Sequence, residues 1–124
     1  IGGISNNNDT AAIRAVIKQV RAKSDCEILL MTPAFGYEDP RKTPDWTATV
    51  DPAGTGYRSR LLKLAAEENC GFLDINGAWG QYIRDSVSCL GWFKRDGVHA
   101  NERGKQILGR IVATFLAPEP EAAQ

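Results

Sequence analysis

Between Asp25 and Pro33 the chain reads Glu27-Ile28-Leu29-Leu30-Met31, a short apolar run that a proline closes. A run of this length with such flanks is typical of a strand buried on both faces. A second short run, Phe72-Leu73-Asp74-Ile75, comes later in the chain. The two runs predict strands of a parallel sheet, which needs helices over its faces.

Helical patterns surround both predicted strands. The predicted helices cover residues 10–23, 57–69, 78–84 and 101–116. Asp9 and Thr10 suit the N-cap of the first helix, and Gly71 is well placed to end the second as a left-handed cap. The last helix should bury Val112 and Phe115 with the apolar residues before them. Strands that alternate with helices predict βαβ units with right-handed crossovers.

The predicted sheet is incomplete. The chain supplies two full strands and at most the end of a third at Ile1, whereas parallel strands need neighbours and covered faces. We therefore expect another polypeptide segment, upstream of Ile1, to complete the sheet. On this interpretation residues 1–117 are the C-terminal part of one domain. Residues 118–124 are polar and contain proline, so they are expected to form a flexible tail.

Composition argues against several classes of protein. The 124 residues are 43% apolar, enough for one domain with a real core. The charges of fifteen basic and fifteen acidic side chains cancel, so the chain lacks the positive electrostatic field that is typical of a nucleic-acid-binding protein. No apolar run approaches the roughly 18 residues of a membrane span. Three cysteines without a Cys-x-x-Cys pair, and a single histidine, predict neither a disulfide framework nor a bound metal.

The strongest chemical signal is Asp96-Gly97-Val98-His99, in a turn before the last predicted helix. An aspartate three residues before a histidine can fold its carboxylate back onto the imidazole and leave the other ring nitrogen free as a base. The alternative is structural: His99 caps the helix, and Asp96 forms a surface turn. The neighbouring Lys94 and Arg95 are expected to be a solvated pair.

The wider sequence resembles a known family. The Asp96–His99 turn follows Trp92-Phe93 and continues as Ala100-Asn101-Glu102-Arg103-Gly104, which closely resembles the last sequence block of the GDSL/SGNH hydrolases. Upstream, Ile1-Gly2-Gly3-Ile4-Ser5-Asn6-Asn7-Asn8-Asp9 resembles the third block of the family. Ile28-Leu29-Leu30-Met31-Thr32-Pro33 resembles its fourth strand, which runs into a substrate-side loop. The resemblance extends to about Leu116.

This resemblance implies a serine hydrolase of small carboxylic esters, with acetyl esters of carbohydrates as one plausible substrate. It implies a three-layer α/β/α, flavodoxin-like parallel sheet, of which this chain holds the C-terminal half. His99 matches the general base of the family and Asp96 the carboxylate of the triad. No cofactor or metal is implied. The nucleophilic serine belongs to a Gly-Asp-Ser block that this chain lacks, so the expected partner is an N-terminal fragment of the same hydrolase.

The family also implies an asparagine whose side-chain amide donates to the negatively charged oxygen (the oxyanion) that forms during ester hydrolysis. In the family this asparagine stands in the pattern Gly-x-Asn. Counted from Gly3, that position holds Ser5, which is a departure from the pattern. Asn6 is preferred because it stays nearest the end of the expected strand, and Asn8 is the alternative. The asparagines could instead only turn the chain and cap the helix.

Aromatic residues are candidates for substrate contact. The segment 32–56 is a long loop rich in proline and glycine, and it carries Phe35, Tyr37 and Trp46. Trp92 precedes the Asp96–His99 turn. Packing under the loop is the alternative role for all four. The rival function is a non-catalytic module that keeps the hydrolase scaffold and binds a partner through its open sheet edge.

Overall fold

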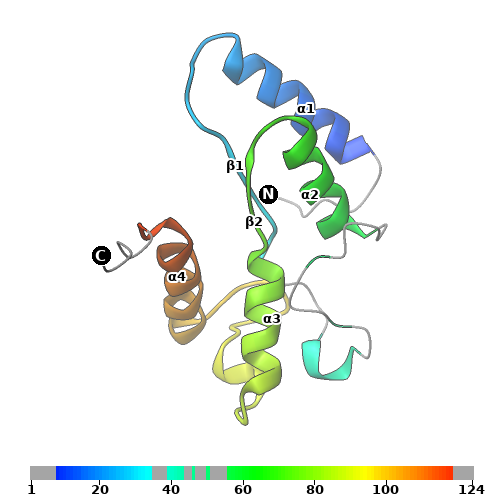
Figure 1. Ribbon diagram of the computed structural model, residues 1–124. Helices are drawn as coiled ribbons and strands as arrows, with labels where there is room; N and C mark the ends of the chain where they lie inside the picture. The colour runs from blue at the N-terminus through cyan, green and yellow to red at the C-terminus, as the bar shows by residue number, and fades with distance from the viewer. Residues whose placement is uncertain (1–7, 35–38, 44–45, 47–49, 51–55, 119–124) are drawn as a thin grey trace, which may run out of the picture.

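The computed structural model describes residues 8–34, 39–43, 46, 50 and 56–118. The helices and strands are α1 (Asn8–Arg21), β1 (Leu29–Met31), the 3-10 turn η1 (Pro40–Lys42), α2 (Tyr57–Glu67), β2 (Gly71–Leu73), α3 (Ile75–Asp85), the 3-10 turn η2 (Leu90–Trp92) and α4 (Glu102–Leu116). Figure 1 shows α1 and α2 gathered around the strands, with α3 and α4 side by side below them.

The two strands are parallel neighbours, as the sequence predicts. Leu29 pairs with Gly71 and Met31 with Leu73, with α2 in the connection between the strands. The ladder continues beyond both strand ends, because the Gly71 amide donates to Ile28 O (2.8 Å) and the Thr32 amide to Leu73 O (3.1 Å). The described residues thus form a mixed α/β fold with a two-stranded parallel sheet.

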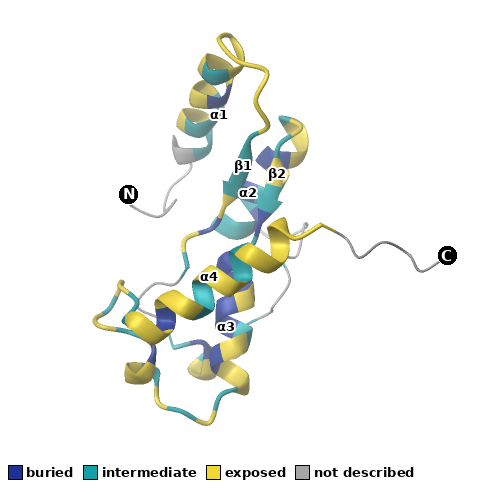
Figure 2. Cartoon of the chain, turned by 90° about the vertical axis from the view of Figure 1, so that its left-hand side faces the viewer, coloured by how far each residue is buried: buried dark blue, intermediate teal, exposed yellow. Residues whose placement is uncertain are grey.

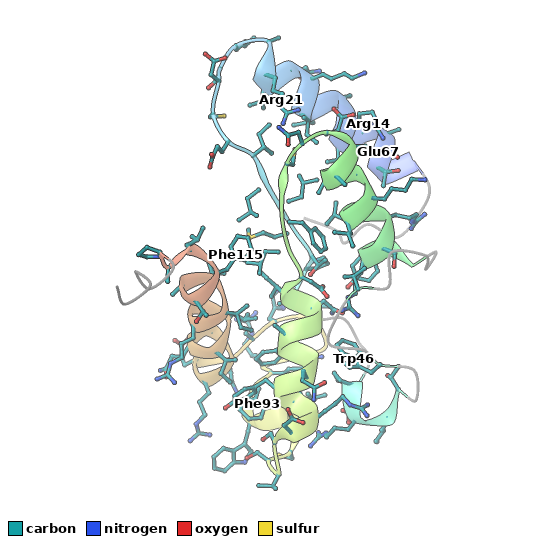
Figure 3. The ribbon with its side chains drawn as sticks, viewed as in Figure 1. Arg14, Arg21, Trp46, Glu67, Phe93 and Phe115 are labelled. Carbon is teal, nitrogen blue, oxygen red and sulfur yellow. The ribbon has the colours of Figure 1, made fainter. Side chains whose placement is uncertain are left out.

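One apolar core joins the first two helices to the sheet. Helix α1 packs on α2, and α2 packs on both strands. The buried apolar side chains of these elements are Ile17, Leu61, Leu64, Ala65 and Leu73. Arg14 of α1 forms ion pairs with Glu67 and Glu68 at the end of α2 (Figure 3). Apolar burial supplies most of the stability here, since exposed ion pairs contribute little.

A second core lies between α3, η2 and α4. Trp79, Ile83 and Phe93 are buried in it, with Leu90, Ile107, Leu108 and Ile111 packed around them. The rings of Trp79 and Phe93 meet edge to face, with their centroids 6.0 Å apart. Such aromatic pairs add about 0.5–1.5 kcal/mol to simple area burial. This core carries the segment between η2 and α4, where the Asp96–His99 turn lies.

The end of α2 differs from the prediction. Gly71 does not adopt the left-handed conformation; Asn69 does, with φ of 50°, and Gly71 begins β2. The Cys70 amide donates to Ala65 O (2.8 Å) and the Asn69 amide to Ala66 O (3.3 Å), which is the hydrogen-bond pattern of a Schellman motif. Asparagine tolerates this conformation, so the left-handed residue lies two positions before the glycine that was expected to adopt it.

Two helix starts also differ from the prediction. Helix α1 begins at Asn8, so Asp9 and Thr10 lie inside its first turn rather than at its N-cap. Helix α3 begins at Ile75, which was expected to end the second strand. Asp74 is its N-cap and accepts a hydrogen bond from the Gly77 amide (3.2 Å). Because Asp74 caps a helix from within the apolar run, the residue after it begins α3 instead of ending the strand.

The last turn of α4 lies open to solvent (Figure 2). Phe115 is 44% exposed and Leu116 is 64% exposed, whereas the sequence predicted that Phe115 would be buried; Val112 is half-buried. Met31 at the end of β1 is likewise 48% exposed. Within the described ranges no element covers these side chains.

Three further observations bear on function. In the described part of the chain no helix has the length and apolar character needed to cross a membrane. The same residues hold no group of three or more histidine, cysteine or acidic side chains that could bind a metal ion. Cys26, Cys70 and Cys89, all of which are described, are free thiols.

Candidate functional site

The Asp96–His99 turn is the tip of a loop that closes on itself. Lys94 and Ala100 form an isolated antiparallel bridge, and the Arg95 amide donates to His99 O (2.8 Å). The Asn101 amide donates to Phe93 O (3.0 Å), and Phe93 is buried in the second core. The backbone therefore fixes both ends of the turn, and the core fixes the base of the loop.

The Asp96 carboxylate organises the turn. Its Oδ1 accepts hydrogen bonds from the backbone N–H groups of Val98 and His99, each at 2.9 Å. The His99 ring nitrogen Nδ1 lies 2.8 Å from both Oδ1 and Oδ2. An ionised carboxylate only accepts hydrogen bonds, so Nδ1 carries the proton in this contact and the neutral ring has an unprotonated Nε2.

The electrostatics of the pair favour an ionised carboxylate. The Val98 amide, and after it the His99 ring, hold the pKa of the Asp96 carboxyl well below its usual range. The Asp96 side chain is 45% exposed and that of His99 is 58% exposed. The hydrogen bonds of the ring to Asp96 are made by Nδ1, and no group among the described residues forms a hydrogen bond with Nε2. The ring is therefore held at one nitrogen and open at the other, which suits a general base.

Asn101 and Gly104, which follow the turn, hold the start of α4 against the residues that precede the turn. Asn101 is the N-cap of α4: its Oδ1 accepts from the Gly104 amide (3.0 Å), and its Nδ2 donates to Trp92 O (2.8 Å). Gly104 lies so close to the chain that an added Cβ would be 2.1 Å from Phe93 O. The Asn-x-x-Gly spacing after His99 thus serves the attachment of the helix to the loop.

The predicted substrate-contacting residues have different surroundings. Trp92 is 50% exposed, and the Arg103 guanidinium stacks over its ring at 4.1 Å from the centroid. Trp46 is half-buried (labelled in Figure 3), and its ring covers Gly80 of α3, where an added Cβ would be 1.6 Å from the ring. The Arg58 guanidinium lies 5.4 Å from the centroid of the same ring. Trp46 therefore has a packing role, and contact with substrate stays a prediction for both tryptophans.

Several candidate residues are not placed. Phe35, Tyr37 and Asn6 lie outside the described residues. Asn8 is the first residue of α1, and its side chain is not described. The structure thus brings together Asp96 and His99, and the choice between the two asparagines stays open.

A polar network at the carboxyl ends of the strands was not expected from the sequence. Thr32 follows β1, and its hydroxyl donates to Asp74 Oδ1 (3.0 Å); Arg58 Nε also donates to this oxygen (3.0 Å). Thr32 Oγ1 accepts from the Asn76 amide (2.9 Å). Because Asp74 also caps α3, the network ties both strand ends to α2 and α3. The cue in the sequence was the position of Thr32 and Asp74 directly after two neighbouring strands.

Lys94 is a further residue whose role the sequence did not indicate. It was expected to form a solvated pair with Arg95, whose side chain is indeed 65% exposed. Lys94 is half-buried instead, and its Nζ donates to Gly97 O (2.8 Å). The expectation was wrong for Lys94 because the bridge to Ala100 turns it towards the loop.

A cavity of about 920 Å³ lies at the amino ends of the strands. Arg21, Cys26, Cys70 and Phe115 are among the residues that line it (Arg21 and Phe115 are labelled in Figure 3). Neither Asp96 nor His99 is among the described residues that line this cavity. The exposed Asp96–His99 pair thus lies apart from this cavity.

Comparisons with known proteins do not assign the chain: no family model, no curated protein and no solved structure matches it.

Proposed function

We propose that this chain is the C-terminal part of an SGNH-type serine ester hydrolase. The observation that carries the proposal is the contact between the Asp96 carboxylate and His99 Nδ1, with Nε2 left open to a further partner. The sequence around the pair, through Asn101 and Gly104, supports the same assignment by its resemblance to the last block of the GDSL/SGNH hydrolases.

In the proposed reaction His99 Nε2 accepts the proton of a serine hydroxyl on a segment outside this chain. The serine oxygen attacks the ester carbonyl carbon, and the negative charge on the carbonyl oxygen is met by the amide of Asn6 or Asn8. The imidazolium of His99, stabilised by Asp96, returns the proton to the departing alcohol as the ester C–O bond breaks. Water then hydrolyses the acyl-serine by the same steps.

The proposed serine segment also completes the fold. The described sheet has two strands, whereas the proposed three-layer α/β/α, flavodoxin-like domain needs further parallel strands with helices on both faces. Met31 and Phe115 are large apolar side chains that are exposed. An N-terminal fragment of the same hydrolase, bearing the Gly-Asp-Ser block, is therefore the proposed partner.

The proposed substrates are small carboxylic esters. Acetyl esters of carbohydrates are one class that fits, because an exposed indole such as Trp92 offers a flat apolar surface to a sugar ring. The geometry of the pair itself is independent of the acyl and alcohol groups, so it supports the ester class more strongly than the sugar.

Hydrolysis of p-nitrophenyl acetate by the complete protein tests this function. We expect His99→Ala and Asp96→Asn each to lower kcat by about 10³-fold or more, because the base and its orienting group are lost. Asp85→Asn is the matched control: Asp85 ends α3 and accepts a hydrogen bond from Gln81. It should keep the wild-type rate.

Wild-type activity in His99→Ala would contradict the assignment of the base. Failure of the complete protein to hydrolyse any ester, together with tight binding of another polypeptide at the edge of β1, would favour the non-catalytic module.

A further inference from the structure

The Lys94 amine is bound inside the loop that carries the candidate pair. Lys94 lies on the bridge to Ala100, and its amide donates to Leu90 O (3.2 Å). Its side chain is half-buried and crosses the loop, so that Nζ donates to Gly97 O at 2.8 Å. The acceptor is thus the carbonyl of the residue between Asp96 and Val98.

The contact fixes one particular peptide unit. Gly97 O and the Val98 N–H are opposite ends of the same planar group. Lys94 binds the carbonyl end, and Asp96 Oδ1 accepts from the N–H end at 2.9 Å. Rotation of this peptide would remove the hydrogen bond to the carboxylate and turn a carbonyl oxygen towards it.

The charges around Lys94 agree with this arrangement. Burial lowers the pKa of the Lys94 ammonium, and the nearby carboxylates of Asp96 and Asp39 oppose that shift. Arg95 approaches Asp96 Oδ2 from the solvent side at 3.4 Å. Lys94 therefore acts from within the loop, whereas Arg95 is an exposed neighbour.

We infer that Lys94 is a positioning residue: through the Gly97–Val98 peptide it holds the Asp96 carboxylate on His99 Nδ1. Its effect on catalysis rests on the proposed hydrolase function, and its effect on the geometry of the pair does not.

The test is nitrogen NMR of His99 in the complete protein, at a pH where the ring is neutral. His99→Gln identifies the signals by their loss. In the wild type we expect the Nδ1–H tautomer and a slowly exchanging Val98 amide. Lys94→Met keeps an apolar stem but removes the donor, and it should give a mixture of tautomers and faster exchange of the Val98 amide.

Two controls and one conservative variant separate the effect of the hydrogen bond from the effect of charge. Arg95→Met removes a cation beside Asp96 without touching Gly97 and should keep the wild-type tautomer. Lys105→Met removes an exposed lysine that pairs with Glu102 and should change neither the signals nor the rate. Lys94→Arg retains a donor on a long stem and should restore much of the tautomer preference.

In the ester assay Lys94→Met should lower kcat about 10- to 100-fold, as outer-shell substitutions commonly do, with little change in KM. The Trp79 indole signal reports whether each variant is folded, and Lys94→Leu replaces Lys94→Met if that variant is not. An unchanged tautomer and unchanged Val98 exchange in a folded variant would overturn the inference. Loss of the tautomer without any esterase activity in the wild type would overturn the proposed function alone.

Discussion

At the scale of single residues, the Asp96 carboxylate accepts from two backbone N–H groups and faces one imidazole nitrogen. All these partners lie within three residues of it, so the turn orients the histidine without help from distant elements. Lys94 adds a side-chain contact to Gly97 O inside the same loop. The resulting local arrangement explains how an exposed side chain can still have a defined orientation.

The acid stability of the turn follows from these contacts. The pKa of Asp96 is lower in the folded turn than its ordinary value of 3.8, so the contacts stabilise the folded state above that pH and are lost only as pH falls through the lower folded value. We predict that the carboxyl carbon of Asp96 titrates well below the usual aspartate range. Carbon NMR against pH measures this directly. Titration in the ordinary range would contradict the hydrogen-bonded geometry.

At the scale of elements, the attachment of α4 to the loop depends on Gly104. An added Cβ would lie 2.1 Å from Phe93 O, a backbone atom that cannot move aside cheaply. We predict that Gly104→Ala lowers the free energy of unfolding by about 1–3 kcal/mol, the usual cost of overpacking. Thermal or denaturant unfolding of the complete protein measures the change.

The same helix offers a matched control. An added Cβ at Gly109 of α4 meets nothing within 4 Å. Gly109→Ala should therefore stabilise the protein by up to about 1 kcal/mol, because alanine favours the helix. Equal effects of the two substitutions would contradict the close docking of Gly104.

Much of the element pattern could be predicted from the sequence. Helical patterns located the four helices of the described residues, and the two described strands form the parallel pair that their short apolar runs indicated. The boundaries failed where a single polar residue outweighed the pattern: Asn69 ends α2 before Gly71, and Asp74 starts α3 at Ile75. At such a boundary, hydrogen bonds and packing in three dimensions decide whether the cap or the apolar run determines the structure. The order of residues alone does not show these contacts.

The candidate pair was predictable for a physical reason: its partners are close in sequence, so spacing alone determines whether they can meet. The role of Lys94 depends on how one short loop folds back, and the network of Thr32, Arg58 and Asp74 depends on which distant segments become neighbours. Residue identity gives little information on this. The position of Thr32 and Asp74 after paired strands was the one available cue.

At the scale of the whole molecule, the two cores share few elements. One core joins α1 and α2 to the sheet, and the other joins α3 and α4 through η2. Met31 and Phe115 are exposed beside a sheet of two strands within the described residues. The proposed upstream segment would cover apolar surface as well as supply the nucleophile.

This proposal predicts the behaviour of the 124-residue chain alone. Without the serine it should show no ester hydrolysis, and its uncovered apolar surface should make it poorly soluble or associated with another polypeptide. Sedimentation and the p-nitrophenyl acetate assay measure both properties. A monomeric, soluble and active chain would contradict the assignment of the nucleophile to another segment.

The most direct test is the distance from the reactive serine to His99 in the complete protein. Reaction with an organophosphonate should label one serine outside the present chain, and a crystal structure of the product should place its Oγ within hydrogen-bond reach of His99 Nε2, about 2.6–3.2 Å. A labelled serine far from this nitrogen, or a His99 ring turned away from Asp96, would contradict the account.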